Sequence, residues 1–232
     1  MTVQHDWNSE KIGLAPFLAP LPGDGSLIAS RPVRRAPGAG ITLGKRLFDV
    51  ALALLLLVPL SVLMLAVAGL LLVFEGRPIL YVSERMRAPG QPFRLIKFRT
   101  MTAVEKDAGA TGAHKAWRIT RLGCVLRRTR IDELPQLLNV LRGEMSFIGP
   151  RPERPHFVEQ LAQIIPHYRE RALVKPGLTG WAQVNFPYGA SVEDARMKLS
   201  YDLYYVKHRS PLLNLLILFA TVRVILFQEG AR

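Results

Sequence analysis

The architecture of this chain depends on Val50–Phe74, VALALLLLVPLSVLMLAVAGLLLVF, a stretch rich in Leu, Val and Ala that contains no charged residue. A helix needs roughly 20 consecutive apolar residues to cross the hydrocarbon core of a bilayer. The stretch is too long, and too far from the N-terminus, to be a cleaved signal peptide. The sequence therefore predicts a membrane-associated protein in preference to a soluble one with a buried apolar helix.

Pro59 lies inside this stretch, and a proline within a helix removes a hydrogen bond and kinks or breaks the helix. Two topologies are open: a kinked helix that crosses the bilayer, or a helix–break–helix hairpin that enters and leaves on one face. Basic residues are enriched on the cytoplasmic side of membranes, and here they flank both ends of the stretch, so charge favours the hairpin. They are Arg31, Arg34, Arg35, Lys45 and Arg46 upstream, and Arg77, Arg85, Arg87, Arg94, Lys97 and Arg99 downstream.

The protein has a formal net charge of +13, from 31 Lys and Arg against 18 Asp and Glu. Such an excess predicts an anionic partner, which could be nucleic acid, anionic lipid or a phosphorylated substrate. Because the apolar stretch predicts a membrane protein, we expect membrane lipids and phosphorylated substrates, and no nucleic acid. The single cysteine, Cys124, rules out an intrachain disulfide, and its neighbours predict a buried or half-buried position.

Composition divides the chain into three regions. Residues 1–40, rich in Pro and Gly, predict a flexible tail whose arginines either meet anionic head groups or are simply solvated. Residues 41–76 hold the membrane helix, and residues 77–232 predict a compact domain of α-rich α+β class. Its expected elements are strands at 79–82 and 92–98, helices near 131–141, 154–165 and 192–208, and an apolar helix at 211–227. That last helix is too short to span comfortably, so we expect it at the membrane interface or packed on the domain.

Asp132 and Glu133 stand where the helix near 131–141 should begin. We expect Asp132 at the N-cap and Glu133 in the first turn, where carboxylates commonly cap a helix and compensate its dipole. By itself this position favours capping over catalysis.

Basic residues around the acidic pair change that balance. Arg127, Arg128 and Arg130 precede it, and the rigid segment Pro150–Pro152 after the helix can hold Arg151 in a fixed direction. A carboxylate that attacks phosphorus needs arginines, and usually a divalent metal ion, to offset the negative charge. The alternative is a surface cluster of salt bridges that contributes little.

Other segments narrow the function class. Lys175–Val184 suits a loop that shapes a pocket, or a plain surface turn. Asp202 is a carboxylate in an otherwise apolar, tyrosine-rich helix. The chain has no P-loop, dinucleotide fingerprint, zinc-ligand spacing or Gly-x-Ser-x-Gly elbow, and no Asp-x-Asp of a metal-dependent glycosyltransferase.

The sequence resembles the bacterial sugar transferases, the monotopic polyprenyl-phosphate phosphoglycosyl transferases that initiate exopolysaccharides and related glycans. The similarity follows family order over about residues 41–229, and Tyr188–Asp194 is similar to an exopolysaccharide branch. The matching stretches are Lys45–Asp49, Lys97–Met101, Leu126–Leu137, Asn139–Ser146, Gly149–Glu153 and Pro176–Trp181.

The resemblance implies that Asp132 attacks the β-phosphate of a UDP-sugar, which releases UMP and leaves a sugar-phosphate–aspartyl intermediate. Polyprenyl phosphate then takes the sugar phosphate. Glu133 would bind Mg²⁺, and Arg127 and Arg151 would hold phosphate charge. Further substrate-binding residues would be Lys97, Arg99, Pro150, Pro152 and Asp202, while Lys45 and Arg46 would lie beside the lipid phosphate.

The resemblance also implies a re-entrant helix broken near Pro59, on the cytoplasmic face of the bacterial inner membrane. Val58 stands where the best-known members carry serine. Many members add N-terminal spans and another domain, so this chain is expected to be a minimal catalytic form, with a homodimer among the assemblies open to it. The alternatives are a non-catalytic adaptor that binds anionic lipid and a glycosyltransferase that releases UDP. The sugar is not determined.

Overall fold

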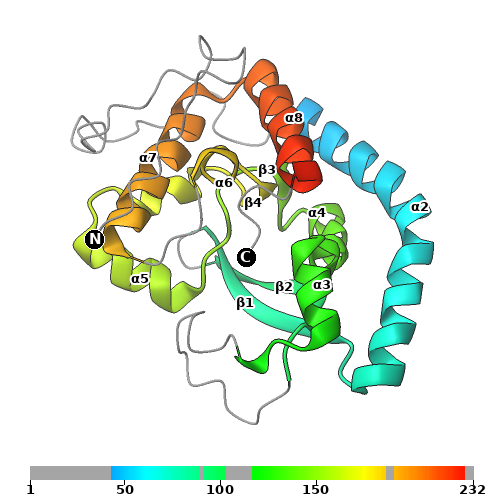
Figure 1. Ribbon diagram of the computed structural model, residues 1–232. Coiled ribbons are helices and arrows are strands. Elements are labelled where there is room, and N and C mark those ends of the chain that lie inside the picture. Colours follow the sequence, from blue (N-terminus) through cyan, green and yellow to red (C-terminus); the bar gives the residue numbers. More distant parts are fainter. Residues whose placement is uncertain (1–42, 89–90, 103–116, 187–190, 228–232) are drawn as a thin grey trace.

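The computed structural model is α-rich with two small pairs of strands, which confirms the expected α+β class. Figure 1 shows the long helix α2 along one side, the hairpin β1–β2 near the centre, and α5 and α7 on the opposite side. The expected tail and Tyr188–Ala190 lie outside the residues that the structure describes. Those residues are 43–88, 91–102, 117–186 and 191–227.

The helices and strands follow this order along the chain. They are α2 (Leu43–Glu75), β1 (Leu80–Ala88), β2 (Gln91–Phe98), α3 (Arg121–Arg128), the 3₁₀ helix η3 (Ile131–Gln136), α4 (Leu137–Arg142), β3 (Ser146–Ile148), α5 (Pro155–Ile164), the 3₁₀ helix η4 (Tyr168–Leu173), β4 (Gly177–Thr179), α6 (Trp181–Asn185), α7 (Val192–His208) and α8 (Pro211–Phe227).

The two strands expected near the start of the domain form an antiparallel hairpin in which Leu80 pairs with Phe98. A second pair, β3 and β4, is parallel and was not predicted. The backbones pass unusually close together just after β3. A Cβ added at Gly149 would lie only 2.2 Å from the carbonyl oxygen of Lys175. Glycine is required at such an approach.

Helix α2 is continuous through Pro59, so the expected break in the helix at this residue is absent. The helix instead changes direction along its length (Figure 1). The Ser61 hydroxyl donates a hydrogen bond of 2.6 Å to the carbonyl oxygen of Val58, beside the proline. A neighbouring hydroxyl is a common partner for backbone groups near a proline in a membrane helix.

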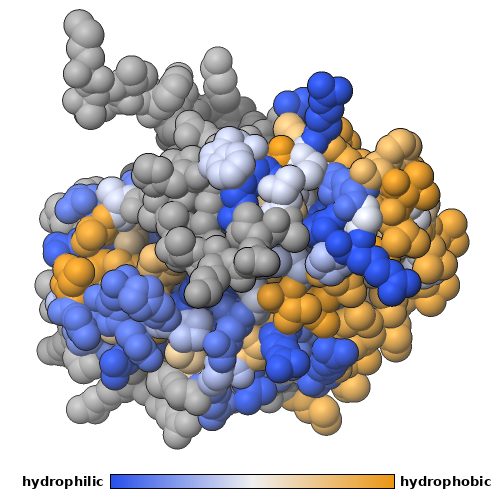
Figure 2. Space-filling model, turned by 90° about the horizontal axis from the view of Figure 1, so that it is seen from below, coloured by the Kyte–Doolittle hydropathy of each residue, from blue (hydrophilic) through white to orange (hydrophobic). Residues whose placement is uncertain are grey.

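Both halves of α2 pack on the same domain. Ala53 joins the main core, whereas Val67 and Leu71 pack with Phe98 and Leu126 in a second cluster. Most other apolar side chains of the helix stay exposed, and it is long and apolar enough to cross a membrane. Figure 2 shows hydrophobic residues gathered on the side of the molecule where α2 lies. This exposure supports membrane association.

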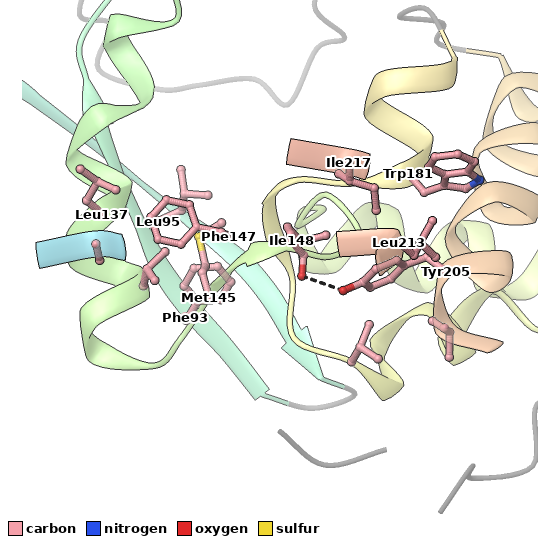
Figure 3. Close-up of a cluster of buried hydrophobic side chains, with 14 residues drawn as sticks. Phe93, Leu95, Leu137, Met145, Phe147, Ile148, Trp181, Tyr205, Leu213 and Ile217 are labelled. Carbon is pink, nitrogen blue, oxygen red and sulfur yellow. Dashed lines mark hydrogen bonds between the residues drawn. The ribbon is translucent and has the colours of Figure 1, made fainter. Parts of the chain in front are cut away.

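The main core lies between β2, α4, β3 and α6–α8 (Figure 3). Tyr205 of α7 donates its hydroxyl to the carbonyl oxygen of Ile148 at 3.3 Å. The same hydroxyl bonds the Asn214 side chain at 2.9 Å, which explains a polar residue in the apolar helix α8. Leu213 and Ile217 bury one face of α8, so the expected packing of this helix on the domain is confirmed. The core thereby fixes β3, from which Gly149–Glu153 emerges.

Candidate active site

Asp132 and Glu133 lie in the first turn of η3, but Asp132 is not the N-cap that the sequence predicts. Arg130 takes that position with a left-handed backbone (φ 59°), and no side chain caps the turn. Helix α3 ends at Arg128, so the chain has only two residues in which to reverse before η3. The left-handed Arg130 makes this tight turn, so Asp132 lies two positions after the N-cap.

The two carboxylates differ in their electrostatic surroundings. Asp132 is 5 % exposed, and burial, together with the charge of Glu133, raises its pKa to about 6. Burial opposes ionisation of Glu133 as well, but Arg151 and Arg130 hold the pKa of Glu133 below its usual range. Two neighbouring carboxyl groups with separated pKa values are typical of catalytic sites.

Lys97 and Arg127, which the resemblance assigns to substrate binding, belong to the same electrostatic cluster. Lys97 lies on β2 with its ammonium 5.6 Å from the centre of the Tyr81 ring. Burial lowers the pKa of Lys97, and the charge of Asp132 partly restores it. Arg127, at the end of α3, is directed by a hydrogen bond of 2.8 Å from its Nε to the Thr100 hydroxyl. Both cations offset the charge of Asp132.

Arg151 reaches the acidic pair from the segment that follows β3. Its Nη2 lies 2.9 Å from Oε1 of Glu133, and its Nη1 donates to Oε1 of Gln183 at 3.1 Å. The side chain is 45 % exposed, so the guanidinium remains accessible to a ligand. The buried prolines on either side hold the backbone: the Pro150 carbonyl accepts from Gly177 N–H, and that of Pro152 from Arg85. Pro150 and Pro152 therefore contribute to the site by fixing the position of Arg151.

Asp202 is 2 % exposed and forms an ion pair of 2.7 Å with Arg171. Burial raises the pKa of Asp202 to about 6, although Arg171 opposes the shift. Arg171 also donates to the Tyr168 hydroxyl and to the carbonyl oxygen of Arg151, each at 3.0 Å. Through Arg171, Asp202 therefore helps to hold the backbone of Arg151 in place. Arg171 was missed in the sequence, where the one available signal is that a buried Asp requires a cation.

Three other predicted cations hold α2 to the domain. Arg99 donates to the carbonyl oxygens of Glu75 and Gly76, and none of its hydrogen bonds reaches Asp132 or Glu133. Arg46 donates to two carbonyl oxygens at the end of α4, both at 2.6 Å. Lys45 donates to the Ser146 hydroxyl at 2.5 Å and pairs with Asp49. The structure does not bring these three to the acidic pair.

A cavity of about 160 Å³ lies beside the Pro150–Glu153 segment. Arg171, Val174 and Pro176 contribute to its wall, so the start of the expected pocket loop does border a hollow. Residues of β1, α5 and η4 line the rest of the cavity.

Cations around two carboxylates, on a domain that carries one long apolar helix, are the arrangement expected of a membrane-associated protein that acts on phosphorylated substrates. Residues 41–228 match the family described as bacterial sugar transferase, and the chain belongs to this family. The resemblance seen in the sequence is thus confirmed.

Relatives carry more specific names. The chain is 44% identical over 189 residues to UDP-N-acetylgalactosamine-undecaprenyl-phosphate N-acetylgalactosaminephosphotransferase of Aeromonas hydrophila, covering 81% of the chain and 45% of the relative. It is 37% identical to UDP-glucose:undecaprenyl-phosphate glucose-1-phosphate transferase of Escherichia coli, over 82% and 42% of the two chains. It is 36% identical to the exopolysaccharide production protein ExoY of Sinorhizobium fredii, over 84% and 90%. The chain thus spans less than half of the first two relatives.

Proposed function

We propose that this protein transfers a sugar 1-phosphate from a UDP-sugar to polyprenyl phosphate, releasing UMP, as the first step of exopolysaccharide synthesis. The observation that carries the proposal is the pair Asp132–Glu133 held among Lys97, Arg127 and Arg151. The names of the relatives support the substrate class, because two of them contain a UDP-sugar and undecaprenyl phosphate and a third contains exopolysaccharide production.

Asp132 is the proposed nucleophile. A carboxylate oxygen forms a bond to the β-phosphorus, the bond from that phosphorus to the bridging oxygen breaks, and UMP leaves with the electron pair. An oxygen of polyprenyl phosphate then attacks the same phosphorus and displaces Asp132. With a pKa of about 6, Asp132 is mostly ionised at neutral pH. Arg127 and Arg151 would offset phosphate charge in both steps.

Mg²⁺ is the proposed cofactor. In the parts of the chain that the structure describes, no three His, Cys, Asp or Glu side chains gather closely enough to hold a metal ion. The acidic pair nevertheless fits Mg²⁺, which is commonly held by one or two carboxylates together with substrate phosphates. Glu133 would be the ligand, and the ion would supply positive charge to the diphosphate.

The proposed location is the cytoplasmic face of the bacterial inner membrane, with α2 re-entrant. Attachment of both ends of α2 to one domain supports this topology, since a crossing helix separates its ends. Lys45 and Arg46 would then act at the head-group level mainly by docking α2. A homodimer and direct binding of individual membrane lipids stay predictions.

The test is UMP release from a panel of UDP-sugars by the purified protein with undecaprenyl phosphate and Mg²⁺. We expect UMP, and a loss of at least about a thousandfold in rate for Asp132→Asn, as is typical when a catalytic nucleophile is removed. Thermal unfolding checks that the variant is folded. Lipid binding without any UMP release would favour the adaptor, UDP release would favour an ordinary glycosyltransferase, and turnover by Asp132→Asn would exclude the aspartyl intermediate.

A further inference from the structure

Gln183, on the short helix α6, is joined to the proposed site by a hydrogen bond with Arg151. Its Oε1 accepts the hydrogen bond from Nη1 of Arg151 at 3.1 Å. Its Nε2 is buried and finds no partner within the described residues. A buried amide donor without an acceptor is unfavourable, and such groups in native structures often have a functional reason.

The unpaired amide follows from what Arg151 requires. A guanidinium has only donors, so Gln183 must present its oxygen to Arg151 and direct its nitrogen elsewhere. That nitrogen lies near Gly180, 3.5 Å from the position that a Cβ would take there. The hydrogen bond to Arg151 therefore leaves the amide nitrogen of Gln183 without an acceptor among the described residues.

Arg151 is held at three points. Glu133 binds Nη2 at 2.9 Å, Gln183 binds Nη1, and Arg171 binds the backbone carbonyl at 3.0 Å. In the proposed reaction Glu133 would hold Mg²⁺ and Arg151 would bind phosphate, so the ion pair between them would open when the donor binds. With 45 % of its side chain exposed, Arg151 would then be free to swing into solvent unless a second anchor holds it.

We propose that Gln183 is this second anchor, a positioning residue that keeps Nη1 of Arg151 in place while Nη2 exchanges Glu133 for a phosphate oxygen of the nucleotide. Because the Gln183 side chain is neutral, it fixes Arg151 without competing for its charge, as a carboxylate would. The inference rests on the proposed function, since it assumes that Arg151 meets the phosphates of the donor.

The test compares binding of UDP and of uridine, with Mg²⁺, by the full chain in detergent. Gln183→Met keeps the shape of the side chain and removes both the acceptor and the unpaired donor. We expect its affinity for UDP to fall about tenfold, the loss typical of one charge-assisted hydrogen bond. Uridine affinity and the thermal midpoint should not fall, and KM for the UDP-sugar should rise more than kcat decreases.

Asn185→Leu is the matched control, because Asn185 lies on the same helix and its amide, among the described residues, bonds the carbonyl oxygen of Trp181 rather than any residue of the proposed site. It should bind UDP as the wild-type protein does. Gln183→Met should also have no further effect on UDP affinity in an Arg151→Met background, since the anchor then has nothing to hold.

Each result has a separate meaning. Equal effects of Gln183→Met with and without Arg151 would overturn the inference, because Gln183 would then act on the ligand directly. If the wild-type protein releases UMP but Gln183→Met binds UDP as tightly as wild type, the inference is overturned and the proposed function is not. Failure of the wild-type protein to bind UDP would overturn the proposed function and the inference with it.

Discussion

Asp132 and Glu133 are adjacent in one turn of 3₁₀ helix, yet their surroundings move their pKa values in opposite directions. The difference follows from where the cations lie. Arg151 contacts Glu133 directly, whereas Asp132 is buried, feels the charges of Lys97 and Arg127, and forms no ion pair with any cation in the described part of the chain. An ionised carboxylate with few direct partners is the more available nucleophile of the two.

This difference predicts opposite effects on stability when each carboxyl group is replaced by its amide. The folded-state pKa of Asp132 is about 6, above the ordinary value of 3.8, so ionisation destabilises the fold above pH 6 and has no such effect below pH 3.8. Asp132→Asn should therefore raise the free energy of unfolding at pH 8 by on the order of 2 kcal/mol, and the gain should fade as the pH approaches 4.

Thermal unfolding at pH 8 and pH 5, without Mg²⁺, measures this effect. Glu133→Gln is the matched variant, and it should lower stability at pH 8 because it removes the ion pair with Arg151. An Asp132→Asn protein that is less stable than wild type at pH 8 would contradict the raised pKa of Asp132.

Individual site residues differed in how well the sequence could predict them. Asp132, Glu133 and Arg151 stand in recognisable local patterns, and the structure brings them together. Gln183 and Arg171 could not be predicted, because their roles depend on contacts with residues about 30 or 20 positions away in the chain. Cys124 was predicted at least partly buried and is exposed, since the contacts of α3 with the core are made by Leu126 on another face.

Among the elements, α2 shows how a membrane helix is joined to a domain. Asp49, 1 % exposed, accepts hydrogen bonds from the Ser146 hydroxyl at 3.1 Å and the Phe147 N–H at 3.2 Å, and it pairs with Lys45. A charged residue at the edge of an apolar helix usually has a specific partner. Here the partner is β3, which leads directly into Pro150 and Arg151.

Asp49→Ala should therefore destabilise the protein by about 3 kcal/mol, because it removes the ion pair with Lys45 and leaves the buried N–H of Phe147 without this acceptor. UMP release should fall as well, since β3 positions Arg151. Ser61→Ala is the matched control on the same helix: it removes an exposed hydroxyl bond and should change the thermal midpoint little. Equal midpoints for the two variants would show that Asp49 does not hold α2.

The sequence analysis did not predict β3, β4, η4, α6 or α3, although α3 is amphipathic and capped by Thr120. Strands β3 and β4 have three residues each, and they pair in parallel across a distance of about 30 residues. Asn139, in one of the stretches that match the family, has a structural role: it is fully buried and bonds Ile96, Arg94 and Glu144, which joins α4 to β2. The long apolar and amphipathic elements, by contrast, were predicted because their periodicity is local.

For the whole molecule, the arrangement of α2 bears on topology. The helix has 33 residues, so a straight one would be about 50 Å long, more than the roughly 30 Å hydrocarbon core. Its first turns bond α4 through Arg46, and its last turn bonds Arg99, the residue that follows β2. If α2 crossed the bilayer, one of these two sets of contacts would be broken. The folded domain is compatible with both ends lying on one side.

This constraint predicts the outcome of cysteine labelling in a Cys124→Ser background. Gly44→Cys, where an added Cβ meets no atom within 4 Å, and Arg77→Cys, at an exposed position, mark the two ends of α2. A membrane-impermeant maleimide should label both in inverted vesicles and neither in intact spheroplasts. Val62→Cys, an exposed position in the middle of the helix, should be protected in both because lipid covers it. If the two ends were labelled from opposite sides, α2 would span the membrane, and the contacts of Arg46 and Arg99 could not form in the same molecule.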